Sequence, residues 1–136
     1  MDDYIVGGKS DKPFFKLYCT GKFEMGGISL PENIFDIFNP VTKWLNEYFI
    51  AYNQPTTINM YFEYLNTASS RTLMKIIQDL NVMIENNSEV NIHWHFQTGD
   101  YDMKEFGLEL QDESRCSFNI IENPNLSDIV SRNILD

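Results

Sequence analysis

The chain has 136 residues, of which 43% are apolar and 14% aromatic, and its 20 acidic and 10 basic residues give a formal charge of -10. This length and composition predict a single folded domain with an ordinary hydrophobic core. The acidic balance argues against binding to nucleic acid or to anionic lipid, because both need clustered Lys and Arg. Proteins are therefore the expected partners.

The cysteines and the N-terminus add two further expectations. Cys19 and Cys116 stand alone, and form neither a disulfide framework nor a C-x-x-C metal motif. The N-terminus lacks a signal-peptide pattern, and no run approaches the roughly 18 apolar residues that span a bilayer. We therefore expect a reduced, cytoplasmic protein without direct membrane binding.

The first part of the chain reads as an arm followed by a hairpin. Residues 1–12 are polar and contain glycines, which predicts a flexible N-terminal arm. Residues 14–19 and 22–29 read as two strands around the turn Thr20-Gly21.

A long amphipathic helix is predicted next. Asn39 is a good N-cap, Pro40 suits the first helical position, and Pro55 marks the end. The apolar residues follow a helical period: Val41, Trp44, Leu45, Tyr48, Phe49 and Tyr52.

Residues 56–65 alternate as a strand, with Ile58, Met60, Phe62 and Tyr64 on one face and polar residues or Tyr61 on the other. The helix that follows should end at Asn86-Asn87, and its apolar stripe is Leu73, Ile76, Ile77, Leu80 and Ile84. Residues 90–96 alternate again, with His93 and His95 on the outward face.

The remaining segments complete a single-domain α/β fold. Residues 99–112 predict a helix, residues 117–122 a strand, and residues 123–136 a C-terminal extension with a short capping helix. The order is β-β-α-β-α-β-α-β, which favours a mixed sheet of about five strands with parallel pairs. Because the strands alternate rather than being apolar throughout, we expect the helices mainly on one face of the sheet.

The most informative segment joins the strand 56–65 to its helix. Asn66, Thr67, Ser69 and Ser70 crowd the point where the helix begins, around Ala68. Unpaired N–H groups and the helix dipole favour an added negative charge there, so a phosphoryl group on Thr67 would be accepted. A plain helix cap explains one or two of these residues equally well.

Catalytic and metal-binding interpretations have weaker support. His93 and His95, with Glu63 or Asp100 as a third ligand, define the metal-dependent enzyme that we keep as an alternative. A nucleophile among Thr67, Ser69 and Ser70 has no G-x-S-x-G context. The acidic residues of 100–113 are typical of a solvated helix face. The pairs Gly7-Gly8 and Gly26-Gly27 are typical of turns or bulges. No cofactor and no enzymatic activity are expected.

Six segments, in order, resemble the SiaC family of bacterial regulatory phosphoproteins. Residues 61–71, YFEYLNTASSR, look like that family's EYFNTSSSK signature, and residues 26–33 are similar to its G-x-S-x-P-E-N. The other four similar segments are residues 44–48 (W-L-x-x-Y), 90–94, 102–107 and 118–122. The resemblance covers about residues 13–122, so the expected divisions are an arm at 1–12, a SiaC-like domain at 13–122 and an extension at 123–136.

This resemblance implies a STAS-like fold, as in anti-sigma-factor antagonists, and a partner-switching function. It implies that a Ser/Thr protein kinase phosphorylates Thr67 and that a PP2C-type phosphatase removes the phosphate. The unphosphorylated form would bind and activate a diguanylate cyclase (a GGDEF protein), and so influence cyclic di-GMP signalling and biofilm formation. Asn66, Ala68, Ser69 and Ser70 would surround the phosphosite, Ala68 replacing a serine of the family signature. A partner-switching anti-sigma-factor antagonist with another target is the alternative.

Overall fold

The computed structural model describes residues 1–84 and 89–135. The elements in chain order are β1 (Tyr4–Val6), β2 (Phe14–Leu17), β3 (Lys22–Ser29), α1 (Ile34–Ala51), β4 (Thr56–Leu65), α2 (Thr67–Met83), β5 (Val90–Gln97), α3 (Tyr101–Glu113), β6 (Ser117–Asn123) and α4 (Leu126–Arg132). None of these helices is long and apolar enough to cross a membrane.

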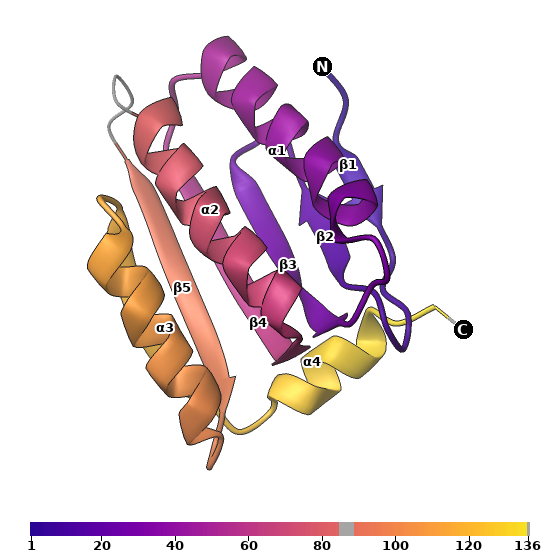
Figure 1. Cartoon of the computed structure of the whole chain (residues 1–136). Coiled ribbons are helices and arrows are strands. Elements are labelled where there is room, and N and C mark those ends of the chain that lie inside the picture. Colours follow the sequence, from indigo (N-terminus) through magenta and orange to yellow (C-terminus); the bar gives the residue numbers. More distant parts are fainter. Residues whose placement is uncertain (85–88, 136) are drawn as a thin grey trace.

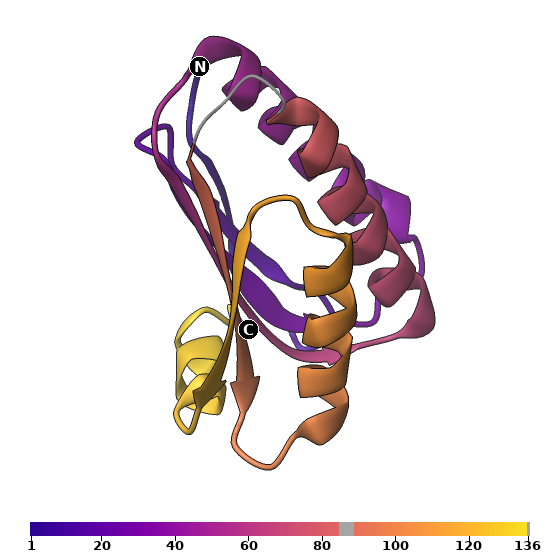
Figure 2. The ribbon, with the colours of Figure 1, turned by 90° about the vertical axis from the view of Figure 1, so that its left-hand side faces the viewer.

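The strands form one mixed sheet in the order β1-β2-β3-β4-β5-β6. The pairs β1–β2 and β2–β3 are antiparallel, whereas β3–β4, β4–β5 and β5–β6 are parallel. Helices α1, α2 and α3 cover one face, and of the helices in the described part of the chain only the short α4 lies on the other (Figures 1 and 2). The α/β fold and the one-sided helix layer are confirmed, and the predicted short C-terminal helix is present as α4.

The expected count of about five strands was too low by one, because the N-terminal arm contains β1. Tyr4–Val6 pairs with β2, and the backbone before it is also held. The carbonyl of Asp2 accepts a hydrogen bond from Trp44 Nε1 at 2.8 Å, and the carboxylate of Asp3 accepts one from the Cys19 N–H at 2.7 Å. Three residues are too few to show an alternating pattern, so this strand could not be predicted from the order of apolar and polar residues.

Helix α1 begins at Ile34 rather than at Pro40, which was a wrong prediction. Asn33 is the N-cap, with its side chain accepting from the Phe35 N–H at 3.2 Å. Pro40 lies inside the helix, where it cannot donate to the carbonyl of Asp36. Burial of Ile34 and Phe38 extends the apolar stripe by almost two turns and offsets that loss.

Strand β2 stops at Leu17, two residues before the predicted end. Helix α2 ends at Met83, and the residues expected to close it, Asn86 and Asn87, lie outside the described part of the chain. The pair Gly26-Gly27 adjoins a β-bulge, as expected, with Gly27 at φ 100°.

The core lies between the sheet and helices α1 to α3. Its largest fully buried side chains include Trp94, Tyr48, Phe23 and Phe62. Because β3, β4 and β5 are parallel, their carboxyl ends and the starts of α1, α2 and α3 share one edge of the sheet. This carboxyl edge is where the segment around Thr67 lies.

Candidate functional site

The junction between β4 and α2 is built around the cap residue Asn66. Its backbone is extended, and its side-chain oxygen accepts a hydrogen bond from the Ser69 N–H at 2.8 Å. Its own N–H donates to the carbonyl of Ser29, at the end of β3, at 3.0 Å. Asn66 therefore caps the helix and also fixes the helix start to the neighbouring strand.

Ser69 is fully buried and has a structural role. Its hydroxyl lies 2.7 Å from the hydroxyl of Ser29 and donates to the Ser29 carbonyl at 3.1 Å. These two bonds hold the first turn of α2 against the end of β3. Ser70 is half-buried, and its N–H donates to the carbonyl of Asn66 at 3.0 Å. A kinase has no direct access to the Ser69 hydroxyl.

Thr67 is exposed, and it is the first residue of α2. Ala68 beside it is exposed as well, and the first turn of this helix contains no acidic residue. The positive end of the helix dipole is therefore not balanced by an acidic side chain in that turn. Arg71 is exposed and lies four residues further on, which is the spacing at which helical side chains meet. A phosphoryl group on Thr67 would find both the helix N–H groups and this guanidinium.

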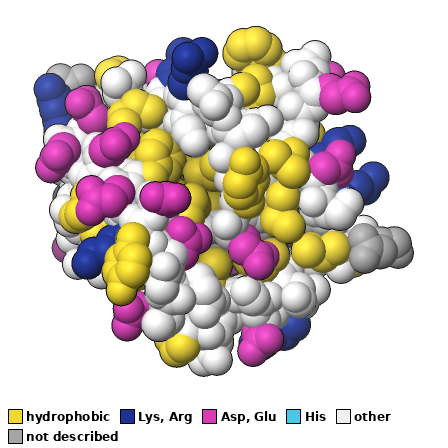
Figure 3. All heavy atoms as spheres, turned by 60° about the horizontal axis from the view of Figure 1, so that its bottom comes forward, with side chains coloured by type: hydrophobic (Ala, Val, Ile, Leu, Met, Phe, Trp, Pro, Cys, Tyr) yellow, Lys and Arg dark blue, Asp and Glu magenta, His cyan; other side chains and the backbone are white. Residues whose placement is uncertain are grey.

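Four exposed apolar side chains lie at the same carboxyl edge of the sheet as Thr67 and form an apolar face. It consists of Leu30 after β3, Phe35 in the first turn of α1, Tyr64 at the end of β4 and Tyr101 at the start of α3. Between 42% and 70% of each of these side chains is exposed to solvent. Figure 3 shows hydrophobic side chains gathered on this end of the molecule, with acidic side chains around them. Exposed apolar patches of this kind mark surfaces that bind other proteins.

Sequence reasoning missed this apolar face. Tyr64 shares a face of its strand with the buried side chains of Met60 and Phe62, but 54% of it is exposed. The pairing of β3 with β4 shifts register at Gly27/Ile28, and β4 continues beyond its buried stretch. The signals in the sequence were one apolar residue immediately after a strand (Leu30), one at the end of a strand (Tyr64) and two at helix starts (Phe35 and Tyr101), where polar residues are usual.

The two histidines lie elsewhere, on the outer face of the sheet. His95 Nε2 lies 3.0 Å from Asn59 Oδ1, and its Nδ1 lies 3.3 Å from the Asn123 amide. Its ring stacks on Tyr61 with centroids 4.4 Å apart, while His93 meets the amide of Asn119 at 3.4 Å. Both nitrogens of His95 are therefore engaged by amide groups.

The ligands considered for a metal site are not brought together. Glu63 accepts a hydrogen bond from the Ser127 hydroxyl at 3.2 Å, and Asp100 caps α3 by accepting from the Met103 N–H at 3.2 Å. Within residues 1–84 and 89–135, no three His, Cys, Asp or Glu side chains form a possible metal cluster. The acidic residues of α3 are mostly exposed. The geometry supports neither the metal-dependent enzyme nor a nucleophile activated by histidine.

We expect His95 to make the protein less stable as the pH falls from about 6.5 to about 4. Burial, and to a smaller extent the charge of His93, lowers the pKa of His95 from 6.5 to about 4. Between these values the unfolded chain binds a proton that the folded chain does not, so the free energy of unfolding decreases with falling pH. Because the ring is only half-buried, we expect a loss of about 1–2 kcal/mol.

Urea denaturation of the wild type and His95→Gln across this range measures the effect. The variant should lose less stability than the wild type over the same interval, since glutamine does not titrate. Identical pH profiles would show that His95 does not contribute.

The comparisons with known proteins agree with this fold. The family model described as SiaC family regulatory phosphoprotein matches residues 8–123. The uncharacterized protein PA14_02130 of Pseudomonas aeruginosa (strain UCBPP-PA14) is 26% identical over 119 residues, which cover 87% of this chain and 93% of that protein.

Solved structures of similar fold come from Pseudomonas aeruginosa. Apo-SiaC superposes with a TM-score of 0.81 at 24% identity, covering 89% of this chain and 99% of that one. A chain in the crystal structure of the diguanylate cyclase SiaD in complex with its activator SiaC gives a TM-score of 0.83 at 24% identity, covering 89% of this chain and 100% of that one. At this identity the two structures establish the fold.

Proposed function

Because the chain belongs to the SiaC family of regulatory phosphoproteins, we propose that it is a binding protein, not an enzyme, whose phosphorylation at Thr67 controls its partner. The observation that carries this proposal is the position of Thr67. It is exposed at the first residue of α2, next to an apolar face of the kind that binds proteins.

The proposed partner is a diguanylate cyclase. In Pseudomonas aeruginosa, the similar protein SiaC is the activator of the diguanylate cyclase SiaD and forms a complex with it. By analogy, the unphosphorylated form of this chain binds and activates a cyclase of that type through its apolar face. Synthesis of cyclic di-GMP, and with it biofilm formation, would then depend on the state of Thr67.

A Ser/Thr protein kinase and a PP2C-type phosphatase complete the proposed switch. The kinase adds a dianion at the edge of the sheet that carries the apolar face, and this releases the cyclase. The phosphatase removes it and restores binding. Asn66 and Ser69 keep the helix start in place in both states, because their hydrogen bonds do not involve the Thr67 hydroxyl.

We expect a phosphate on Thr67, and none on Ser69, when the protein is isolated from its native cells. The reason is that Thr67 is exposed whereas Ser69 is fully buried against Ser29. Phosphopeptide mapping by mass spectrometry, with and without phosphatase treatment, measures this. In the same cells, the Thr67→Ala protein used as bait should capture a GGDEF protein. Phosphate found only at other residues would refute the switch, and capture of an anti-sigma factor would replace the cyclase with that target.

A further inference from the structure

Helices α1 and α2 together carry no net charge. These two helices contain three acidic residues (Asp36, Glu47 and Asp79) and three basic ones (Lys43, Arg71 and Lys75). The whole net charge of -10 therefore lies on other parts of the chain. Helix α3, by contrast, carries five acidic residues and one basic residue. Two copies that meet through the α1–α2 surface avoid the repulsion that a strongly acidic element such as α3 would cause.

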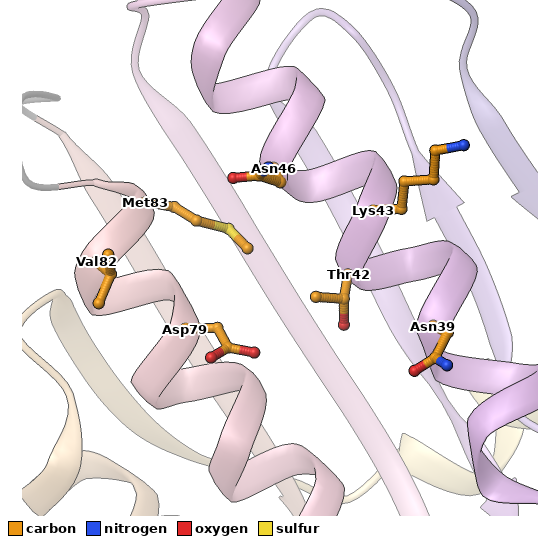
Figure 4. A pocket seen from close by; sticks show the side chains of 7 residues that line it. All are labelled: Asn39, Thr42, Lys43, Asn46, Asp79, Val82 and Met83. Carbon is orange, nitrogen blue, oxygen red and sulfur yellow. The ribbon is translucent and has the colours of Figure 1, made fainter.

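A groove of about 500 Å³ runs between these two helices. It is lined by Asn39, Thr42, Lys43 and Asn46 from α1 and by Asp79, Val82 and Met83 from α2 (Figure 4). The Asp79 side chain points into the space between the helices, whereas Lys43 points away from α2 (Figure 4). Within the described residues Asp79 pairs with Lys75 at 3.2 Å, and Lys43 has no ion pair. Lys43 is thus free to reach another molecule.

Two apolar side chains complete this surface. Ile50, in the last turn of α1, is 78% exposed, and Val82, in the last turn of α2, is 72% exposed. They are the two most exposed large hydrophobic side chains among the described residues. Neither belongs to the apolar face at the carboxyl edge, because both lie at the opposite ends of their helices.

We propose that the α1–α2 surface is the interface of a homodimer. In a two-fold symmetric interface, every contact between two different residues occurs twice, once in each direction. Lys43 of each copy can therefore pair with Asp79 of the other. The surface is therefore complementary to itself in charge, and Ile50 and Val82 supply apolar area. A stable dimer needs about 800 Å² from each copy, roughly a tenth of the 7280 Å² that one chain exposes. Two helices of 17 and 18 residues, each about 25 Å long, offer an area of this order.

Such a dimer presents two copies of the Thr67 face. A dimeric partner that engaged both copies would bind more tightly than one site allows, without any new contact. Dimerisation itself does not depend on the partner or on Thr67. It can therefore be tested independently of the proposed switch.

Two charge reversals, alone and mixed, test the interface. The Lys43→Glu homodimer would contain two repulsive Glu–Asp contacts, and the Asp79→Lys homodimer two Lys–Lys contacts. Each variant alone should raise the dimer dissociation constant about 10-fold or more. A mixture of the two variants should dimerise like the wild type, because both contacts in the mixed dimer are again between opposite charges. Sedimentation velocity distinguishes the 15.9 kDa monomer from the dimer.

Matched controls keep the test specific. Arg115→Glu and Glu109→Lys change the net charge by the same amounts at exposed positions outside the two helices, and should leave the dimer unchanged. Thermal melting of every variant shows whether it is folded. A wild type that remains monomeric at 100 µM, or a dimer that the reversals leave intact, would overturn the proposal. Failure of the mixture to recover dimers would overturn it as well.

Discussion

Replacing Thr67 by glutamate should weaken binding to the cyclase partner by about 30- to 150-fold, that is by about 2–3 kcal/mol. A partner packed on the apolar face would have to desolvate the added carboxylate. The protein already carries a charge of -10, so an acidic partner would also be repelled. A phosphate carries about twice the charge of glutamate at pH 7, and its effect should be at least as large.

The same substitution should leave the fold intact. A negative side chain at the first position of α2 is stabilised by the helix dipole by about 0.3–1 kcal/mol. Thr67 is exposed, so the change removes little buried area. The melting temperature of the variant should therefore equal or slightly exceed that of the wild type. This combination, lower affinity with unchanged stability, distinguishes a switch from a damaged surface.

Isothermal titration calorimetry with the purified cyclase measures the loss, and two variants serve as controls. Thr67→Ala removes the hydroxyl without adding charge and should bind within about threefold of the wild type. Ser117→Glu adds the same charge at an exposed position where β6 begins, at the opposite edge of the sheet from Thr67. It should bind normally. Equal affinity of Thr67→Glu and wild type would exclude Thr67 as the control point.

The sequence was sufficient for the elements that carry strong local patterns. Thr56–Leu65 and Lys22–Ser29 have the predicted ends, and Asn66 caps α2, because alternation and cap chemistry act over a few residues. The start of α1 was misplaced because burial of Ile34 and Phe38 depends on the tertiary structure and outweighs the local signal of Pro40.

Only part of the candidate site could be predicted, because the rest also depends on the tertiary structure. That a phosphoryl group would be accepted on Thr67 followed from the helix start and the family resemblance. The burial of Ser69 against Ser29 joins residues 40 apart in sequence, and no local pattern encodes it. The apolar face combines Leu30, Tyr64 and Tyr101, which lie at or after the ends of three different strands, β3, β4 and β5. Only the parallel order of β3, β4 and β5 brings their ends to one edge.

Replacing Trp94 by alanine should have the largest effect on stability, with a loss of about 3–5 kcal/mol in the free energy of unfolding. Trp94 is fully buried on β5 and is the largest such side chain. Its indole N–H donates to the carbonyl of Met103 in α3 at 2.9 Å, and its ring lies 5.7 Å from that of Phe106. An added Cβ on Gly107 would clash with the indole of Trp94, so α3 approaches the sheet closely at this point.

The truncation therefore leaves a cavity between α3 and the sheet. Because α3 already packs closely on the sheet, it can move only slightly to reduce that cavity. The midpoint of thermal unfolding should fall by roughly 10 to 17 °C for a two-state domain of this length. Urea denaturation at constant pH measures the free energy, and Trp94→Phe is the matched control. Phenylalanine keeps an aromatic ring in place and loses the hydrogen bond to Met103, so its cost should be less than half that of alanine. A loss below 1 kcal/mol for Trp94→Ala would mean that Trp94 does not hold α3 on the sheet. The position of Tyr101, which begins α3 and belongs to the apolar face, would then not depend on Trp94 either.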